Sequence, residues 1–151
     1  MGPMTTHDSL DLQTTEPWSQ QYPSSPRSVP RARRELRKML ERWGHGAEDI
    51  DRVLLVSSEL ATNAVRHGRQ RDCRFEVRVT TTGTDCLIEV SDASSVRLPR
   101  AVTAASDDES GRGLVLVAAL TKDMGHHLRD PIGKTVWARL ELHTPEGGSH
   151  D

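Results

Sequence analysis

The apolar positions in the first half of the chain recur every three to four residues, which is the spacing of amphipathic helices. From Ser28 to Trp43 they form one stripe, and Gly44 follows where a helix would end. Ser28 is of a type that often caps helix N-termini, so we expect it to be the N-cap. A second helix is predicted from Glu48 to Arg66. One of its faces carries an apolar stripe, and the opposite face carries Leu55, Glu59, Asn63 and Arg66. A helix with two occupied faces is typical of the centre of a domain.

After the second helix the period of the pattern changes to two. Apolar and polar residues alternate over Cys73–Thr80, a turn is expected at 83–85, and alternation resumes until Asp92. This pattern predicts a β-hairpin with one buried face. The remaining expected elements are an edge strand at Trp18–Tyr22, a helix from Gly113 to Leu120, a strand at His126–Arg129, a turn at 130–133 and a last strand at Val136–Leu142.

This order of helices and hairpins predicts an α+β fold. We expect a two-layer sandwich of a mostly antiparallel, mixed sheet with helices packed on one face. The length of 151 residues favours one domain. The expected division is a flexible N-terminal tail at 1–21, a domain at 22–143 and a C-terminal tail at 144–151, because both ends are rich in polar residues, proline or glycine.

The charge of the chain is nearly balanced. Lys and Arg number 20 against 22 Asp and Glu, a formal charge of −2, so the composition provides no basic field for a nucleic-acid partner. The charges are nevertheless unevenly distributed, because the outer face of the first helix is basic. That face could bind phosphate or an acidic partner, or could be an ordinary solvated face. It comprises Arg31, Arg33, Arg34, Arg37, Lys38 and Arg42.

Nothing in the sequence suggests secretion, a membrane span or a zinc site. No basic segment followed by an apolar run opens the chain, and no apolar run approaches 20 residues, so we expect a cytoplasmic protein without membrane contact. Cys73 and Cys86 do not form a CxxC pair and are expected to be reduced thiols. His45, His126 and His127 are expected in loops or strands, not as metal ligands or phosphoacceptors.

Two residues of the second helix form the first candidate site. Glu59 and Asn63 are four apart, which places a carboxylate and an amide side by side on one helix face. A carboxylate there could accept a proton, and an amide oxygen could ligate Mg²⁺. The pair alone is weak evidence, since such residues are usually solvated.

Two further candidates come later in the chain. Asp92 ends an alternating strand and is followed by small residues, so its carboxylate could accept the exocyclic amine of adenine, or could simply start a turn. Gly111, Arg112 and Gly113 precede the third helix. Glycines at a helix start bring backbone N–H groups and the positive end of the helix dipole close to phosphate.

The order of these features is that of a known family. The chain resembles the GHKL ATPase superfamily from about Tyr22 to Leu142. The segment Leu55–Gly68 is similar to a helix of bacterial anti-sigma-factor serine kinases of the small single-domain type common in actinobacteria, with His67 and Gly68 at its exit. The resemblance implies the Bergerat ATP-binding sandwich, a homodimer, and a mobile lid over the nucleotide between Asp92 and Gly113.

The resemblance also implies roles for single residues. Glu59 matches the catalytic base of the family, Asn63 its Mg²⁺ ligand, and Asp92 the residue that binds the adenine amine. Arg112, lying between Gly111 and Gly113, belongs to the matching phosphate-side motif.

Two positions of the family pattern concern the adenine site. Thr135 matches a threonine of the final strand that supports this site. The superfamily usually continues its adenine-binding Asp as DxGxG, whereas Asp92 is followed here by Ala, Ser, Ser and Val. The loss of glycine's backbone freedom bears on nucleotide affinity more than on fold.

By this resemblance the expected function is an ATP- and Mg²⁺-dependent protein serine/threonine kinase. It would phosphorylate a serine of an anti-sigma-factor antagonist, bind a sigma factor, and regulate transcription by partner switching. A nucleotide-sensing, protein-binding module without kinase activity is the alternative. A small nucleic-acid-binding domain is more remote, because the near-neutral charge and few aromatic residues count against it.

Overall fold

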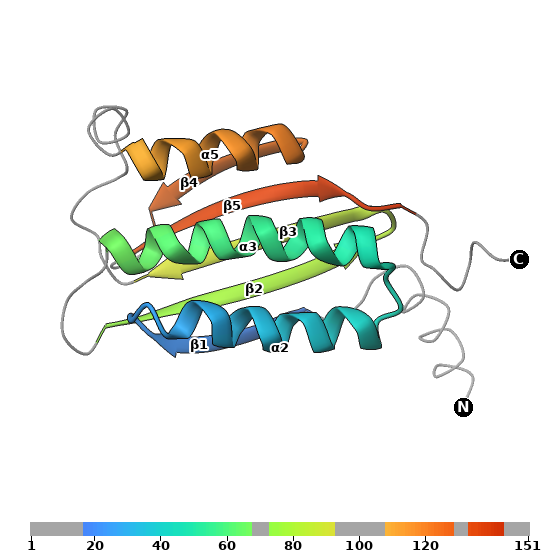
Figure 1. The fold of residues 1–151 in the computed structure, drawn as a ribbon, viewed down its shortest axis with the longest axis horizontal. Helices are drawn as coiled ribbons and strands as arrows, with labels where there is room; N and C mark the ends of the chain where they lie inside the picture. The colour runs from blue at the N-terminus through green and yellow to red at the C-terminus, as the bar shows by residue number, and fades with distance from the viewer. Residues whose placement is uncertain (1–16, 68–72, 93–107, 129–132, 144–151) are drawn as a thin grey trace, which may run out of the picture.

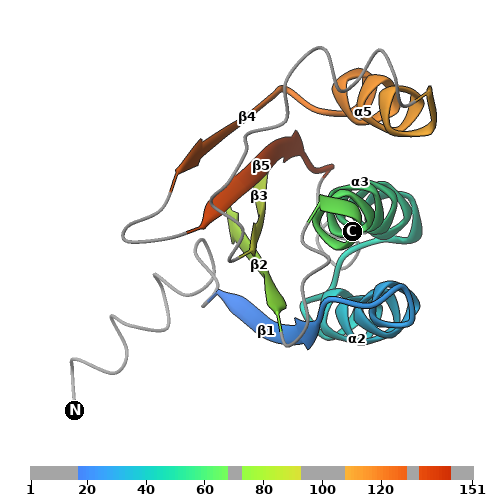
Figure 2. The same ribbon diagram turned by 90° about the vertical axis from the view of Figure 1, so that its left-hand side faces the viewer.

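In the part of the chain that the structure describes, five strands form one sheet, and three helices cover one of its faces (Figures 1 and 2). The computed structural model describes residues 17–67, 73–92, 108–128 and 133–143. The helices are α2 (Ser28–Arg42), α3 (Ala47–His67) and α5 (Asp108–Leu120). The strands are β1 (Trp18–Pro23), β2 (Arg74–Thr82), β3 (Asp85–Asp92), β4 (Asp123–Leu128) and β5 (Lys134–Glu141).

The sheet confirms the predicted α+β sandwich. Its strand order is β1-β2-β3-β5-β4, and all four described strand pairs are antiparallel. The expectation that the sheet would be mixed is therefore wrong for the part that the structure describes. The cause is the connectivity: β2 with β3 and β4 with β5 are hairpins, and β4 runs in the same direction as β3, so β5, which lies between them, is antiparallel to both.

The core lies between the sheet and the helices, with α3 at its centre. Figure 2 shows α3 between α2 and α5 over the sheet. The alternation of β2 and β3 buries one side of each strand, as in Phe75, Val77, Ile88 and Val90. On α3 the fully buried side chains are Val53, Leu54, Val56 and Leu60. The central position predicted for this helix is confirmed.

Ser28 does not cap the first helix as expected. It is the first residue of α2, preceded at the N-cap position by Arg27, which makes no side-chain capping bond. The buried Ser28 hydroxyl instead donates a hydrogen bond of 2.7 Å to the carbonyl of Pro23, and so ties the helix start to the end of β1. The predicted helix stop is confirmed, because Gly44 has a φ of 91° that only glycine adopts readily.

The later elements begin earlier than expected. Helix α5 starts at Asp108 and not near Gly113, and β4 starts at Asp123 and not at His126. Glycine inside a helix is unfavourable by only about 1 kcal/mol per residue, so packing overrides it. The proposed lid falls largely at 93–107, outside the described residues.

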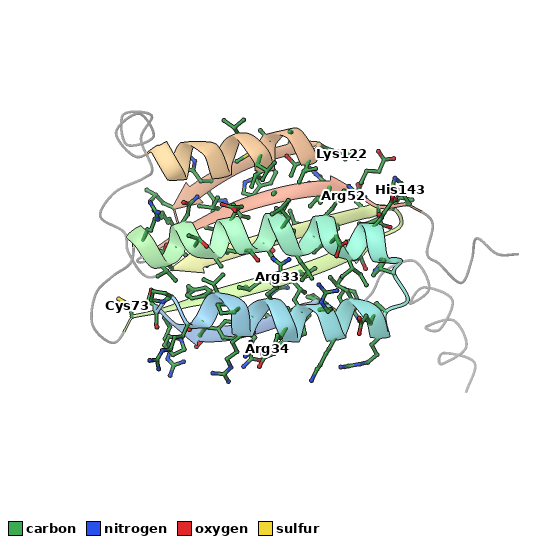
Figure 3. All side chains as sticks on the ribbon, viewed as in Figure 1. Arg33, Arg34, Arg52, Cys73, Lys122 and His143 are labelled. Atoms are coloured by element: carbon green, nitrogen blue, oxygen red, sulfur yellow. The ribbon has the colours of Figure 1, made fainter. Side chains whose placement is uncertain are left out.

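A buried carboxylate joins the start of α3 to the end of the sheet. Asp49 is 2% exposed and accepts hydrogen bonds from the guanidinium of Arg52 at 2.7 Å and from the backbone N–H of His143 at 2.9 Å. Arg52 also donates to the carbonyl of Glu141. Figure 3 shows Arg52 and His143 together at one end of the molecule.

None of the described helices combines the length and apolar character needed to span a membrane. The tails expected at 1–21 and 144–151 lie mostly outside the described residues. The end of the expected N-terminal tail belongs to β1, which begins at Trp18.

Candidate functional site

The ends of four elements meet on the side of the molecule opposite Arg52 and His143. These are the end of α3, the end of β3, the start of β5 and the start of α5 (Figure 1). Each carries one of the sequence features singled out above. The fold therefore gathers features that are far apart in the chain on the same side of the domain.

Glu59 and Asn63 lie one turn apart on α3, as their spacing requires. Both side chains are half-buried, so they are held by the surrounding protein and are still accessible. Their carboxylate and amide groups lie on the same side of the helix.

Gly113 of α5 lies directly against the carboxylate of Glu59. A Cβ atom at position 113 would overlap Oε1 of Glu59. This contact with a side chain, and not the backbone conformation, distinguishes glycine here, and an alanine would require the end of the Glu59 side chain to move. This contact brings the first and third candidate features together, and it fixes where the Glu59 carboxylate can lie.

The two glycines, however, do not precede the helix. Gly111 and Gly113 lie within the first two turns of α5. The free N–H groups of a helix belong to its first residues, so those of α5 lie at the Asp108 end. The side chain of Arg112 is outside what the structure describes, as are that of His67 and all of Gly68.

Asp92 is buried at the end of β3, with 4% of its surface exposed. Its partner in the β3–β5 register is Lys134, which is 2% exposed. Paired residues of neighbouring strands lie on the same face of a sheet, so both side chains are on the side of the helices. Burial lowers the pKa of the Lys134 ammonium, and the nearby negative charge of Asp92 acts in the opposite direction.

Thr135 lies on the other face of the sheet. It pairs with Ser91, and the two hydroxyl groups are hydrogen-bonded at 2.7 Å. Because side chains alternate along a strand, Thr135 is directed away from the face that holds Asp92. The residue beside Asp92 is Lys134, which was not among the residues predicted for the site. Lys134 lies an even number of residues before Ala138 and Leu140, which are buried toward the helices, so the alternation along the strand could have placed it on the same face.

The side chains present fit an adenine nucleotide with Mg²⁺. Asp92 offers a buried acceptor suited to an exocyclic amine, and Asn63 offers an uncharged oxygen of the kind that Mg²⁺ accepts beside phosphate oxygens. The close approach at Gly113 leaves the Glu59 carboxylate against α5, the helix that contains Gly111 and Gly113. Among the described residues, no group of three or more His, Cys, Asp or Glu side chains is arranged to hold a metal ion.

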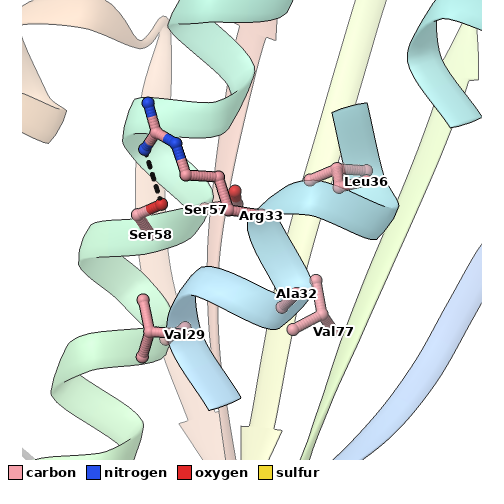
Figure 4. A pocket seen from close by; sticks show the side chains of 8 residues that line it. Val29, Ala32, Arg33, Leu36, Ser57, Ser58 and Val77 are labelled. Atoms are coloured by element: carbon pink, nitrogen blue, oxygen red, sulfur yellow. Dashed lines mark hydrogen bonds between the residues drawn. The ribbon is translucent and has the colours of Figure 1, made fainter. Parts of the chain in front are cut away.

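A gap between α2 and α3 is a different feature from this site. It is lined by residues that include Val29, Leu36 and Val77, and Arg33 donates a hydrogen bond of 3.0 Å to Ser58 across it (Figure 4). It lies on the α2 side of α3, whereas Glu59 contacts α5. On the outer side of α2, Arg34 points away from the protein (Figure 3), as expected for the basic face, whereas Arg33, expected on the same face, is directed toward Ser58 of α3.

Comparison with known proteins identifies the family. A model of the histidine kinase-like ATPase domain matches residues 22–140. The chain belongs to this ATPase family. As a member, it has the ATP-binding type of domain whose candidate site is described above.

Solved structures support the same fold. Among them is the crystal structure of the RsbU and RsbW domains of Rv1364c from Mycobacterium tuberculosis, with a TM-score of 0.63 and 21% sequence identity. The match covers 87% of this chain and 33% of that one, so this chain spans about a third of the solved protein. A search of curated proteins found no match.

Proposed function

We propose that this ATPase-family domain is a protein serine/threonine kinase that transfers phosphate from ATP to a serine of an anti-sigma-factor antagonist. The observation that carries the proposal is the contact of Glu59 with Gly113, which holds a carboxylate against the helix of the phosphate-side motif. The sequence resemblance to anti-sigma-factor kinases supports it, as does the likeness to the structure of the RsbU and RsbW domains of Rv1364c.

In this proposal Asp92 and Asn63 bind the nucleotide and its Mg²⁺, and Glu59 transfers the proton. The Asp92 carboxylate accepts a hydrogen bond from the adenine amine and so orients the base. The Asn63 side-chain oxygen is the ligand for Mg²⁺, which when bound neutralises charge on the phosphates. Glu59 accepts the proton of the incoming serine hydroxyl. Phosphoryl transfer depends mainly on position and charge neutralisation, so few protein groups are needed.

Partner switching requires partners beyond the substrate. In this proposal the domain acts in the cytoplasm as a homodimer and also binds a sigma factor. The basic face of α2, which is exposed at Arg34, is suited to an acidic surface on a protein partner.

The decisive test replaces Glu59 by Gln and measures phosphate transfer from labelled ATP to a panel of purified anti-sigma-factor antagonists. We expect transfer to fall by about 100-fold or more, because general-base catalysis contributes roughly that factor. ATP affinity should change little. Glu48→Gln is the matched control, since Glu48 is an exposed residue at the start of the same helix.

The competing function is a nucleotide-sensing module that binds a protein partner without phosphorylating it. It is favoured by the sequence after Asp92, where Ala, Ser, Ser and Val stand in place of the glycines of DxGxG. The same assay separates the two functions. If the wild type binds ATP and phosphorylates no antagonist of the panel, the sensing module is the better account.

A further inference from the structure

Burying a lysine at the end of a strand costs free energy unless its charge is compensated by a nearby group. Lys134 is 2% exposed, and the helix-facing positions that follow it on β5 are apolar. Removing an ammonium from water costs several kcal/mol even after relaxation. Asp92, directly opposite in the register and equally buried, supplies the compensating charge. The pair lies at the end of the β3–β5 ladder, which directs attention to what it can bind.

The two groups form an acceptor and a donor side by side. The Asp92 carboxylate can only accept hydrogen bonds, and the Lys134 ammonium can only donate them. Adenine presents a donor at its 6-amino group next to an acceptor at N1. Guanine presents the reverse, an acceptor at O6 next to a donor at N1.

Both purine edges are therefore complementary to the pair, with the partners exchanged. Adenine would donate from its 6-amino group to Asp92 and accept at N1 from Lys134. Guanine would accept at O6 from Lys134 and donate from N1–H to Asp92. A carboxylate beside a neutral side chain would instead leave guanine O6 facing a negative charge, which costs affinity.

We infer that Lys134 is a specificity-determining residue of the nucleotide site, and that it allows guanine nucleotides to bind beside adenine nucleotides. The inference rests on the proposed function only in taking Asp92 as the residue that contacts the base. It concerns base selectivity and requires no phosphate transfer.

The test is calorimetric titration of the full chain with ATP and with GTP, both in the presence of Mg²⁺. For the wild type we expect the two dissociation constants to lie within about tenfold of each other, a difference of up to about 1.4 kcal/mol. In Lys134→Thr, the affinity for GTP should fall by at least about tenfold relative to that for ATP. Lys122→Thr is the matched control, because Lys122 is exposed and pairs with Asp85 away from the site.

A second variant guards against a folding defect. Lys134→Met keeps the length of the side chain without its charge and should show the same change in the ATP to GTP ratio. Circular dichroism verifies that each variant is folded. The wild-type comparison needs no variant: ATP binding without GTP binding overturns the inference and leaves the kinase proposal intact. An unchanged ratio in folded variants also overturns it. If the wild type binds neither nucleotide, the proposed function fails as well.

Discussion

Replacing Gly113 by alanine should separate the stability of the domain from its activity. The added Cβ would occupy the space of the Glu59 carboxylate, so the Glu59 side chain must rotate away. Moving a side chain off its preferred rotamer costs about 0.5 to 1.5 kcal/mol. Because Gly113 lies inside α5, alanine also improves helix propensity by about 1 kcal/mol. The two terms nearly cancel, and the free energy of unfolding should change by less than about 1 kcal/mol.

The expected effects are measured in two assays. Thermal unfolding should show a Tm within about 4 °C of the wild type, the shift that 1 kcal/mol produces in a domain of this size. Phosphate transfer to an antagonist should fall about 100-fold, since displacing a catalytic group by about 1 Å has an effect of that order. Ala118→Gly, an exposed substitution on the same helix, measures the propensity term alone and should lower stability by about 1 kcal/mol.

Two results would refute the reasoning. Full transfer activity in a folded Gly113→Ala protein would show that the position of the Glu59 carboxylate does not matter for the reaction. A fall in Tm of well over about 8 °C would show that the Glu59 side chain cannot rotate away and that α3 and α5 must move apart instead.

Three further predictions test other parts of the structure. Thr135→Val should lower stability by about 1 kcal/mol in urea unfolding, through loss of its cross-strand hydrogen bond, and leave ATP affinity unchanged because the residue is on the far face. A change in ATP affinity would contradict that placement. Asp49→Ala should cost about 2 to 3 kcal/mol in urea unfolding, because the charged partner Arg52 and a backbone N–H lose their acceptor; a loss below about 1 kcal/mol would contradict this role. Burial raises the pKa of the Cys86 thiol to about 12, so at pH 8 its thiolate is scarce. Mass spectrometry should then find iodoacetamide on the half-buried Cys73 of the native protein, and on Cys86 only after unfolding.

Local patterns in the sequence predicted the first two helices and the first hairpin well. The stripe of α2, the stop at Gly44 and the pairing of Glu59 with Asn63 on one face depend on residues within a few turns of each other. Periodicity and backbone preference act at that range, so they can be read without knowing the fold.

Features that depend on tertiary contacts were not predictable in the same way. Ser28 finds its partner in Pro23 across the β1–α2 corner, and α5 tolerates two glycines because one of them accommodates Glu59 from another helix. The assignment of Thr135 to the adenine site followed a family resemblance, whereas strand parity places Lys134 beside Asp92. A shift of one residue along a strand reverses the face, and a motif comparison does not record that reversal.

The rung formed by Asp92 and Lys134 also has a consequence for folding. It is the last pair of the β3–β5 ladder, and the segment containing α5 and β4 is the loop that this ladder closes. The pair can therefore meet only after a long loop has closed, and the end of the ladder is where fraying would begin. A nucleotide bound to this pair would stabilise the closed loop, because it would bind only the folded protein. At 100 times its dissociation constant, such a ligand would raise the free energy of unfolding by about 2.7 kcal/mol. The abundance of the folded protein in the cell would thereby follow the supply of nucleotide.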